Sequence, residues 1–353
     1  MNQMRTGLRE LAFALWLTAL LLVAGPASAA TASVNEPLAS GPSLDSMTQA
    51  LAQAHAAVVG LRSVAVTDAR SAETLGRERE GSGVVIDADG LVLTIGYLVL
   101  EADEVDLVMS DKRVVPARVV AYDQASGFGL VQALTPLKLA PVPFGQSGRV
   151  STTEPLLIAS GGDGAALSLA RMVSRRAFSG FWEYHIEGAL FTAPPRPDHS
   201  GAALFNGNGE LLGIGSLIVA DALGPGQPRL AGNMFVPIDL LTPILAEMRE
   251  FGSSRQSHRA WLGVNCVEQA GQLRVLRVSR DSPAEAAGLQ AGDHIVGIDG
   301  TGVNALKAFY VLLWRGSSPE REVTLDVRRG TESQTLKLRS VDRMKTLRQA
   351  QGI

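Results

Sequence analysis

The chain has 353 residues, a formal net charge of −3 at pH 7, 46% hydrophobic residues and 19% charged residues. At about 150 residues per domain, this length predicts two globular domains, and the composition is too apolar for a disordered chain. The chain has 32 basic and 35 acidic residues, so it lacks the positive charge that a nucleic-acid partner requires. Only 5% of its residues are aromatic, which also argues against a platform for base stacking.

One cysteine and five scattered histidines limit metal and redox chemistry. Cys266 has no partner for an intrachain disulfide or a cysteine-based cluster, and its strand-like surroundings indicate a buried small hydrophobe. The histidines never occur as an i,i+4 pair with an acidic neighbour. We therefore expect no metal site and no cofactor.

Residues 1–29 carry the three parts of a secretory signal peptide. Arg5 and Arg9 form a basic region, 11–24 form an apolar run, and an A-x-A cleavage site follows at 27–29. The apolar run is shorter than the ~20 residues that span a bilayer. We expect removal of 1–29 and a periplasmic protein without an integral membrane span, with an uncleaved membrane anchor as the alternative.

The chain from 30 to 250 reads as a leader followed by a β-rich domain. Residues 30–44 are small and polar, as expected of a flexible leader. Helices are predicted over 43–57 and 239–251, where apolar residues recur on one face. Short strands are predicted between them, at 58–66, 83–86, 91–94, 105–109, 114–122, 156–159, 185–191, 203–205, 211–219 and 234–237. Many short strands joined by turns are typical of a sandwich or a pair of barrels, so 45–250 is predicted as one domain.

A second compact unit is predicted over 259–340. Residues 252–257 are polar and break the preceding pattern, so 251–258 is predicted as a linker between domains. Helices are expected at 283–287 and 305–314, and strands at 261–267, 273–278, 294–299, 323–327 and 335–338. The tail, 341–353, is charged and gives no further structural signal.

The second unit carries two informative strings, RAWLGV at 259–264 and SPAEAAGLQAGDHI at 282–295. In the longer string, Ser-Pro starts a helix, Gly288 ends it, and Gly-Asp at 292–293 turns the chain into a strand. Both strings resemble the PDZ domain of the HtrA-type periplasmic proteases.

This resemblance implies a binding site for polypeptide C-termini. In the family, one loop turns its backbone N–H groups toward a peptide's terminal carboxylate, and the peptide adds to the sheet as a strand. The matching positions here are Trp261, Leu262, Gly263 and Val264. One face of the helix at 305–314 would line the same groove. A PDZ fold that has lost its ligand is the alternative.

Residues 45–250 resemble the trypsin-like domain of the same HtrA family. GSGVVIDADG at 81–90 matches the strand and hairpin that precede the catalytic histidine, and NGNGELLGI at 206–214 matches the hairpin that follows the nucleophile. FVPI at 235–238 matches the closing strand. Together the resemblances imply a mostly β fold, in which a trypsin-like double β-barrel protease domain is followed by a C-terminal PDZ domain.

A protease of this fold requires a serine that attacks, a histidine that takes its proton and a carboxylate that orients the histidine. In the family's pattern, the histidine position falls on Tyr97, within TIGYLV at 94–99, and the carboxylate position falls on Gly127, within DQASGFGL at 123–130. Asp123 matches an earlier, non-catalytic acid. The resemblance therefore implies a degenerate triad, and loss of the base alone typically costs about 10⁶ in turnover.

The nucleophile segment is closer to intact, as DHSGAAL at 198–204. Ser200 keeps the nucleophile position, and we interpret it as vestigial. Asp198 replaces a glycine of the oxyanion turn formed by the residues 198 to 200, which puts oxyanion stabilisation in doubt because aspartate visits positive φ less readily. His199 and His185 are the candidate substitute bases. His199 is expected to point away from its neighbour Ser200, and strand alternation leaves the direction of His185 open.

Three classes of function remain from the sequence. The leading hypothesis is an inactive HtrA-like protein that binds polypeptide C-termini or unfolded proteins in the periplasm, in a chaperone-like or regulatory role in protein quality control. The alternative is an active serine endopeptidase that degrades unfolded proteins with Ser200 and a non-standard base. A third is an assembly subunit, because the family commonly forms trimers.

Overall fold

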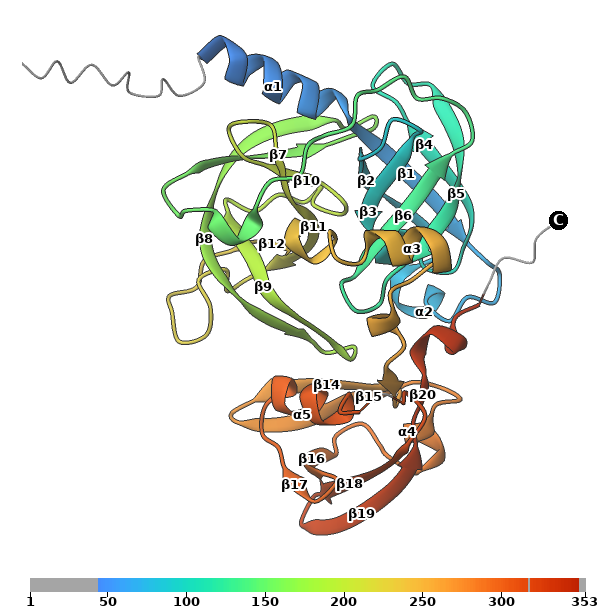
Figure 1. The fold of residues 1–353 in the computed structure, drawn as a ribbon. Coiled ribbons are helices and arrows are strands. Elements are labelled where there is room, and N and C mark those ends of the chain that lie inside the picture. Colours follow the sequence, from blue (N-terminus) through green and yellow to red (C-terminus); the bar gives the residue numbers. More distant parts are fainter. Residues whose placement is uncertain (1–43, 317, 349–353) are drawn as a thin grey trace, which may run out of the picture. The chain divides into compact units, whose positions relative to one another are not determined.

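Two closed β-barrels and a smaller C-terminal domain make up the described part of the chain (Figure 1). The computed structural model describes residues 44–316 and 318–348. The expected signal peptide (1–29) and nearly all of the expected leader (30–44) therefore lie outside the described residues. The mostly β fold expected from the sequence is confirmed.

The first barrel closes in the strand order β1-β2-β3-β6-β5-β4. Its strands are β1 (Val58–Ala65), β2 (Glu78–Val85), β3 (Leu91–Ile95), β4 (Ala102–Val108), β5 (Val114–Tyr122) and β6 (Phe128–Ala133). β3 is buried at every residue, and a short 3₁₀ turn, η1 (Gly96–Leu98), follows it. A one-turn helix, α2 (Ala72–Leu75), lies between β1 and β2. The segment around residue 97 therefore lies directly after a buried strand, at the edge of the packed core.

The second barrel closes in the order β10-β11-β12-β9-β8-β7. Its strands are β7 (Pro155–Ser160), β8 (Ala166–Gly180), β9 (Tyr184–Ala193), β10 (Ala203–Phe205), β11 (Leu211–Val219) and β12 (Gly232–Pro237). β8 and β9 form a long antiparallel hairpin that ends in a tight turn over 180–184. The loop between β9 and β10 carries Ser200.

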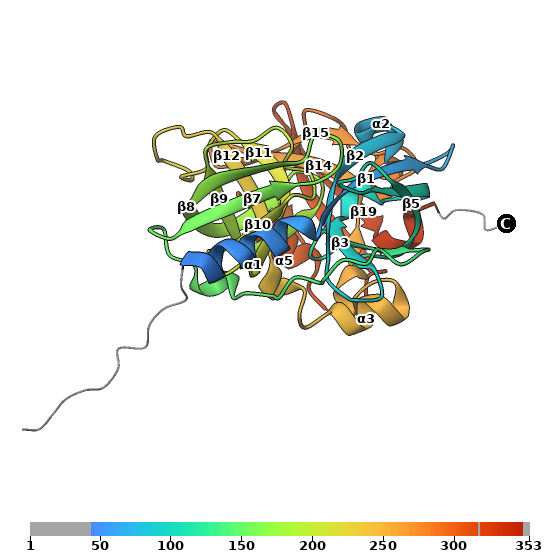
Figure 2. The same ribbon diagram turned by 90° about the horizontal axis from the view of Figure 1, so that it is seen from above.

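Helical segments lie at both ends of the barrel domain. The helix expected at 43–57 is present as α1 (Leu44–Ala56) (Figure 2). The carbonyl of Ala50 approaches Gly209 in the turn between β10 and β11. The helix expected over 239–251 is shorter than predicted. A 3₁₀ turn, η3 (Ile238–Leu240), comes first, and α3 (Leu245–Phe251) begins only after Pro243, because proline disfavours helix in the residue before it.

The C-terminal domain is a sheet in the order β14-β15-β16-β18-β19, with β17 paired to β16. Its elements are β13 (Ala260–Trp261), β14 (Val264–Gln269), β15 (Gln272–Val278), α4 (Pro283–Ala286), β16 (His294–Ile298), β17 (Thr301–Gly302), α5 (Leu306–Leu313), β18 (Glu322–Arg329), β19 (Glu332–Arg339) and β20 (Val341–Asp342). Ser282 caps α4 by accepting a hydrogen bond from the N–H of Glu285. β14 is an edge strand of this sheet.

Several strand predictions differ from the structure. β6 and β8 were not predicted, because β6 is buried almost throughout and shows no alternation, whereas β8 is mostly half-buried and carries several arginines. The strand expected at 261–267 is divided into β13 and β14, since Gly263 between them has a φ of 82°. Within the expected tail, β20 pairs with β13.

A buried carboxylate attaches the linker to the first barrel. Asp123 is fully buried and accepts hydrogen bonds from the N–H of Ser254 at 2.9 Å, the hydroxyl of Ser257 at 2.5 Å and the N–H and hydroxyl of Ser126 at 2.8 and 2.6 Å. Burial alone would raise the pKa of Asp123, but the hydrogen bonds from these three serines outweigh it and hold the pKa below its usual value. Asp123, the non-catalytic acid of the sequence pattern, is therefore a structural anchor.

We predict that Asp123→Asn lowers the free energy of unfolding at pH 7 by about 2 kcal/mol, because hydrogen bonds to a charged acceptor are lost. A depressed folded pKa stabilises the protein above the unfolded pKa of about 4, and this contribution disappears as the pH falls through the folded value. Urea unfolding at pH 7 and at pH 3 measures both effects. The exposed Asp111→Asn is the control, and a deficit of equal size at the two pH values would contradict the assignment.

Candidate functional site

Ser200 and Tyr97 lie in contact although they are 103 residues apart in the chain. Tyr97 is in η1, directly after β3, and Ser200 is in the loop between β9 and β10. The Oη atom of Tyr97 is 2.8 Å from Oγ of Ser200 and 3.0 Å from the carbonyl oxygen of Ser216. A carbonyl only accepts, so the phenol proton goes either to Ser216 or to Ser200. The group that faces the Ser200 hydroxyl is thus a phenol.

The environment of Tyr97 keeps its phenol protonated. Burial raises the pKa of Tyr97 to about 12, and the hydrogen bond with Ser200 opposes this only in part. At pH 7, about one molecule in 10⁵ therefore carries a phenolate. A general base works best with a pKa near the operating pH, and a neutral phenol oxygen is a far weaker base than imidazole. Tyr97 holds the Ser200 hydroxyl in place without the means to deprotonate it.

The space beside Gly127 is occupied by an aromatic side chain. A Cβ atom at Gly127, which has a φ of 85°, would lie 2.7 Å from Oη of Tyr184. Tyr184 is the first residue of β9, and its hydroxyl donates a 2.6 Å hydrogen bond to the carbonyl of Ser126. Both the backbone conformation and the neighbouring ring therefore oppose any side chain at 127.

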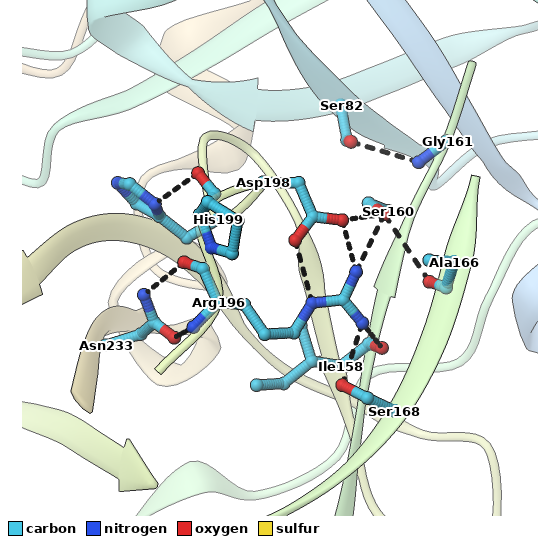
Figure 3. A network of polar contacts seen from close by, with 11 residues as sticks. Ser82, Ile158, Ser160, Gly161, Ala166, Ser168, Arg196, Asp198, His199 and Asn233 are labelled. Atoms are coloured by element: carbon cyan, nitrogen blue, oxygen red, sulfur yellow. Dashed lines mark hydrogen bonds and ion pairs between the residues drawn. The ribbon is translucent and has the colours of Figure 1, made fainter. Parts of the chain in front are cut away.

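The Asp198 carboxylate lies in the loop that carries Ser200, and it is paired with Arg196 (Figure 3). Nε of Arg196 donates to Asp198 at 2.8 Å, Nη2 also bonds the carboxylate, and the hydroxyl of Ser160 donates to it. Burial would raise the pKa of Asp198, but the bonds from Arg196 and Ser160 outweigh it and keep the pKa low. Asp198 is not among the described non-glycine residues with positive φ. The turn therefore lacks the left-handed backbone that a glycine would permit there.

A cleft of about 240 Å³ opens beside Ser200. It is lined by segments of both barrels, including 80–82, 160–164 and 197–198. The N–H of Ser82 donates to the carbonyl of Ser200 at 2.8 Å, and this contact connects the two barrels at the cleft. The volume is smaller than the ~300–1,000 Å³ of typical small-molecule sites, so it suits one side chain or a short peptide segment.

Neither histidine that we considered as a substitute base contacts Ser200 in the described structure. Nδ1 of His199 lies 3.0 Å from the carbonyl oxygen of Pro197. His185 lies between the Ser179 hydroxyl, at 2.8 Å from Nδ1, and the Glu187 carboxylate, at 3.3 Å from Nε2. Nδ1 of His199 and both ring nitrogens of His185 thus face partners other than the candidate nucleophile.

The loop at 261–264 directs backbone N–H groups at a carboxylate. The N–H groups of Leu262, Gly263 and Val264 all donate to the side chain of Glu183, at 2.7 to 3.3 Å. The Trp261 side chain is buried, and the Arg343 guanidinium lies 5.0 Å from the centre of its ring. The loop therefore has the geometry of a carboxylate-binding nest.

The sequence did not single out Glu183, Tyr184 or Arg196. Glu183 and Gly263 are 80 residues apart, and Tyr184 and Ser126 are 58 residues apart, so these contacts leave no local pattern. Arg196 gave only a weak signal, its position two residues before an aspartate that replaces a glycine.

Comparison with known protein families gives two matches. A model of the trypsin-like peptidase domain matches residues 81–214, and a model of the PDZ domain matches 260–339. These matches, together with the DegP and HtrA homologues described below, support a relationship of this chain to the HtrA family. The protein thus has a trypsin-like peptidase domain followed by a C-terminal PDZ domain.

The homologues include several bacterial endoproteases. A probable periplasmic serine endoprotease, DegP-like, of Pseudomonas fulva is 30% identical over 281 residues, which cover 74% of this chain and 57% of the relative. The periplasmic serine endoprotease DegP of Escherichia coli is 28% identical over 243 residues, covering 65% and 50%. The chain spans about half the length of the curated relatives it matches.

The solved structures show the same fold. The HtrA-type protease AlgW with decapeptide has a TM-score of 0.52 at 22% identity, covering 84% of this chain and 98% of that one. A serine endoprotease from Yersinia pestis has a TM-score of 0.51 at 19% identity, covering 86% and 99%. Within the described residues, no helix is long and apolar enough to cross a membrane.

We predict that Gly127→Ala destabilises the protein by more than the ~1–2 kcal/mol that a left-handed backbone alone costs an alanine. The excess arises from the Tyr184 hydroxyl, which lies where the new Cβ would be. The matched control is Gly300→Ala, where φ is 74° and nothing lies within 4 Å of the added atom. Urea unfolding of both variants measures the difference, and equal losses would refute the steric role of Tyr184.

Proposed function

We propose that this chain is an HtrA-like serine protease homologue without proteolytic activity. It binds exposed or C-terminal polypeptide segments in the periplasm, in a chaperone-like or regulatory role in protein quality control. The observation that carries the inactivity is the 2.8 Å contact between the Ser200 hydroxyl and a partly buried, protonated Tyr97. In this proposal, Tyr97 and Gly127 are the degenerate triad positions, and Ser200 is a retained but vestigial nucleophile.

The surroundings of the triad positions support the loss of catalysis. Tyr184 fills the space beside Gly127, so no carboxylate at that position is available to orient a base. The turn that would donate to the oxyanion of a substrate carries the Asp198 carboxylate, which is paired with Arg196. Electrostatic stabilisation of the oxyanion is usually the largest catalytic contribution in such sites, and here its donor turn carries an acidic side chain.

Support for polypeptide binding and location comes from the PDZ domain and the relatives. The 261–264 loop presents three N–H donors to a carboxylate beside an edge strand, which is the donor set that a peptide C-terminus requires. Two relatives are named as periplasmic endoproteases, in agreement with the signal peptide predicted at 1–29. The trimer implied by the family resemblance is part of the proposal, and sedimentation of the purified protein tests it.

We predict that a fluorophosphonate probe leaves Ser200 unlabelled and that an unfolded casein substrate stays intact. Without a base, the serine hydroxyl does not become nucleophilic enough to attack the probe. Labelling is measured by fluorescence in a gel and by mass spectrometry of the peptide that contains Ser200. E. coli DegP serves as the positive control and Ser200→Ala as the negative control. Labelling that disappears in Ser200→Ala, together with cleavage, would instead establish an active endopeptidase with a non-standard base.

We also predict that the full chain binds peptides with an apolar C-terminal residue and a free carboxylate. The amidated form of the same peptide should bind at least about tenfold more weakly, since a charged group that loses its hydrogen bonds costs about 1.5–3 kcal/mol. Isothermal titration calorimetry compares the two forms. Equal affinity for both forms would mean that the 261–264 loop is not the site of binding.

A further inference from the structure

The turn between β8 and β9 lies along the edge of the PDZ sheet. The carbonyl of Phe181 accepts a 3.0 Å hydrogen bond from the N–H of Cys266, on edge strand β14. The Tyr310 hydroxyl, on α5, donates to the carbonyl of Gly180 at 2.7 Å and accepts from the N–H of Glu183 at 3.2 Å. The backbone of the turn therefore contacts both the strand and the helix that border the groove of a strand-adding peptide.

The side chain of Glu183 completes this contact. Its Oε1 atom accepts hydrogen bonds from the N–H groups of Gly263 and Val264, each at 2.7 Å, and its Oε2 atom accepts one from Leu262 at 3.1 Å. The residue is only 4% exposed. An uncompensated buried carboxylate costs several kcal/mol, so the burial of Glu183 depends on these donors.

The backbone at Glu183 is also unusual. Its φ of 57° lies in the left-handed region, which costs a non-glycine residue about 1–2 kcal/mol. Strained conformations of this kind persist where the surrounding contacts compensate for them, and they gather at binding sites and switches. A glycine at this position would form the same turn without strain, but it would supply no carboxylate. The contacts of the carboxylate therefore account for a glutamate here.

We propose that Glu183 is an internal ligand of the PDZ domain: its side-chain carboxylate takes the place of a peptide's terminal carboxylate, and an external peptide binds only after the β8–β9 turn has left the groove. This inference rests on the proposed binding of polypeptide C-termini. It adds that the groove is occupied in the resting protein and that ligands compete with a segment of the peptidase domain.

Another acidic residue on the same hairpin, Glu187, allows the effect of the Glu183 carboxylate contact to be distinguished from the effect of negative charge alone. Glu187 forms a 2.5 Å ion pair with Lys307 of α5, and both side chains are more than half exposed. Exposed ion pairs contribute little to stability, so this pair does not hold the turn in place. Glu187 thus provides a matched control, with the same charge on the same hairpin but no contact with the 261–264 loop.

Glu183 and the PDZ groove belong to one chain, and this connection sets how strongly Glu183 competes with an external peptide. A ligand within the same chain acts at an effective concentration that reaches the millimolar range for short connections. The apparent affinity for an external peptide falls by the fraction of molecules in which the groove is open. If fewer than about one molecule in ten is open, removal of the internal carboxylate tightens peptide binding by about tenfold or more.

The test uses the full chain and the Glu183→Gly variant. Glycine adopts the left-handed φ at no steric cost, so this variant removes the carboxylate and leaves the turn unstrained. Calorimetry with a peptide that has an apolar C-terminal residue and a free carboxylate should give an affinity about tenfold or more tighter for Glu183→Gly than for the natural chain. Glu187→Gln should bind the peptide like the natural chain.

A second pair of measurements reports on the groove directly. Tyr310→Phe removes the hydroxyl that holds Gly180 and Glu183, and it should also tighten peptide binding. Hydrogen exchange at the N–H groups of 262–264 should be slow in the natural chain and faster in both variants, because these N–H groups are now hydrogen-bonded to Glu183.

The outcomes separate this inference from the proposed function. Equal, measurable peptide affinities of the natural chain and both variants would overturn the internal ligand and leave peptide binding intact. If neither the natural chain nor a variant binds peptide, the proposed binding fails, and exchange alone decides. Faster exchange at 262–264 in Glu183→Gly then supports the internal ligand, whereas unchanged exchange refutes it.

Discussion

The turn between β8 and β9 buries two polar side chains in succession, Glu183 and Tyr184, and each requires a partner because an unsatisfied buried polar group costs about 1–3 kcal/mol. Tyr184 donates to the carbonyl of Ser126, and Glu183 accepts from the PDZ loop at 262–264. One turn therefore fixes both the loop that carries Gly127 and the edge of the PDZ sheet. Displacement of the turn from the groove would also strain the contact beside Gly127.

The same turn accounts for much of the chemistry of the candidate site. Two tyrosines, Tyr97 and Tyr184, lie at and beside the positions that the proposed function assigns to the degenerate triad. Tyr97 pairs with Ser200, and Tyr184 fills the space next to Gly127. Tyr184 is buried, Tyr97 is partly buried, and both hydroxyls are hydrogen-bonded, so neutral groups occupy these two places. A protonated phenol beside Ser200 is a poor proton acceptor near pH 7, which is the basis of the proposed inactivity.

The sequence predicted the double-barrel and PDZ architecture because both domains carry contiguous strings, GSGVVIDADG and SPAEAAGLQAGDHI, that resemble segments of a known family. It did not predict β8, since exposed positions of this strand carry Leu167 and Leu169, so its hydrophobic residues do not follow its burial. Tyr97 and Ser200 were candidates because each lies in a recognisable segment. Glu183 was not, because its donors are backbone N–H groups, which any sequence supplies, and only the fold brings them within reach.

The linker determines how strongly Glu183 competes with an external peptide for the groove of the PDZ domain. Asp123 binds Ser254 and Ser257 to the first barrel, and this leaves only a short stretch of chain before Leu262. A short, anchored tether keeps the 261–264 loop near the β8–β9 turn, which raises the effective concentration of the Glu183 carboxylate. Asp123 thus contributes to peptide binding without touching the peptide: weakening its hydrogen bonds lengthens the free tether and lowers the competition that an external C-terminus must overcome.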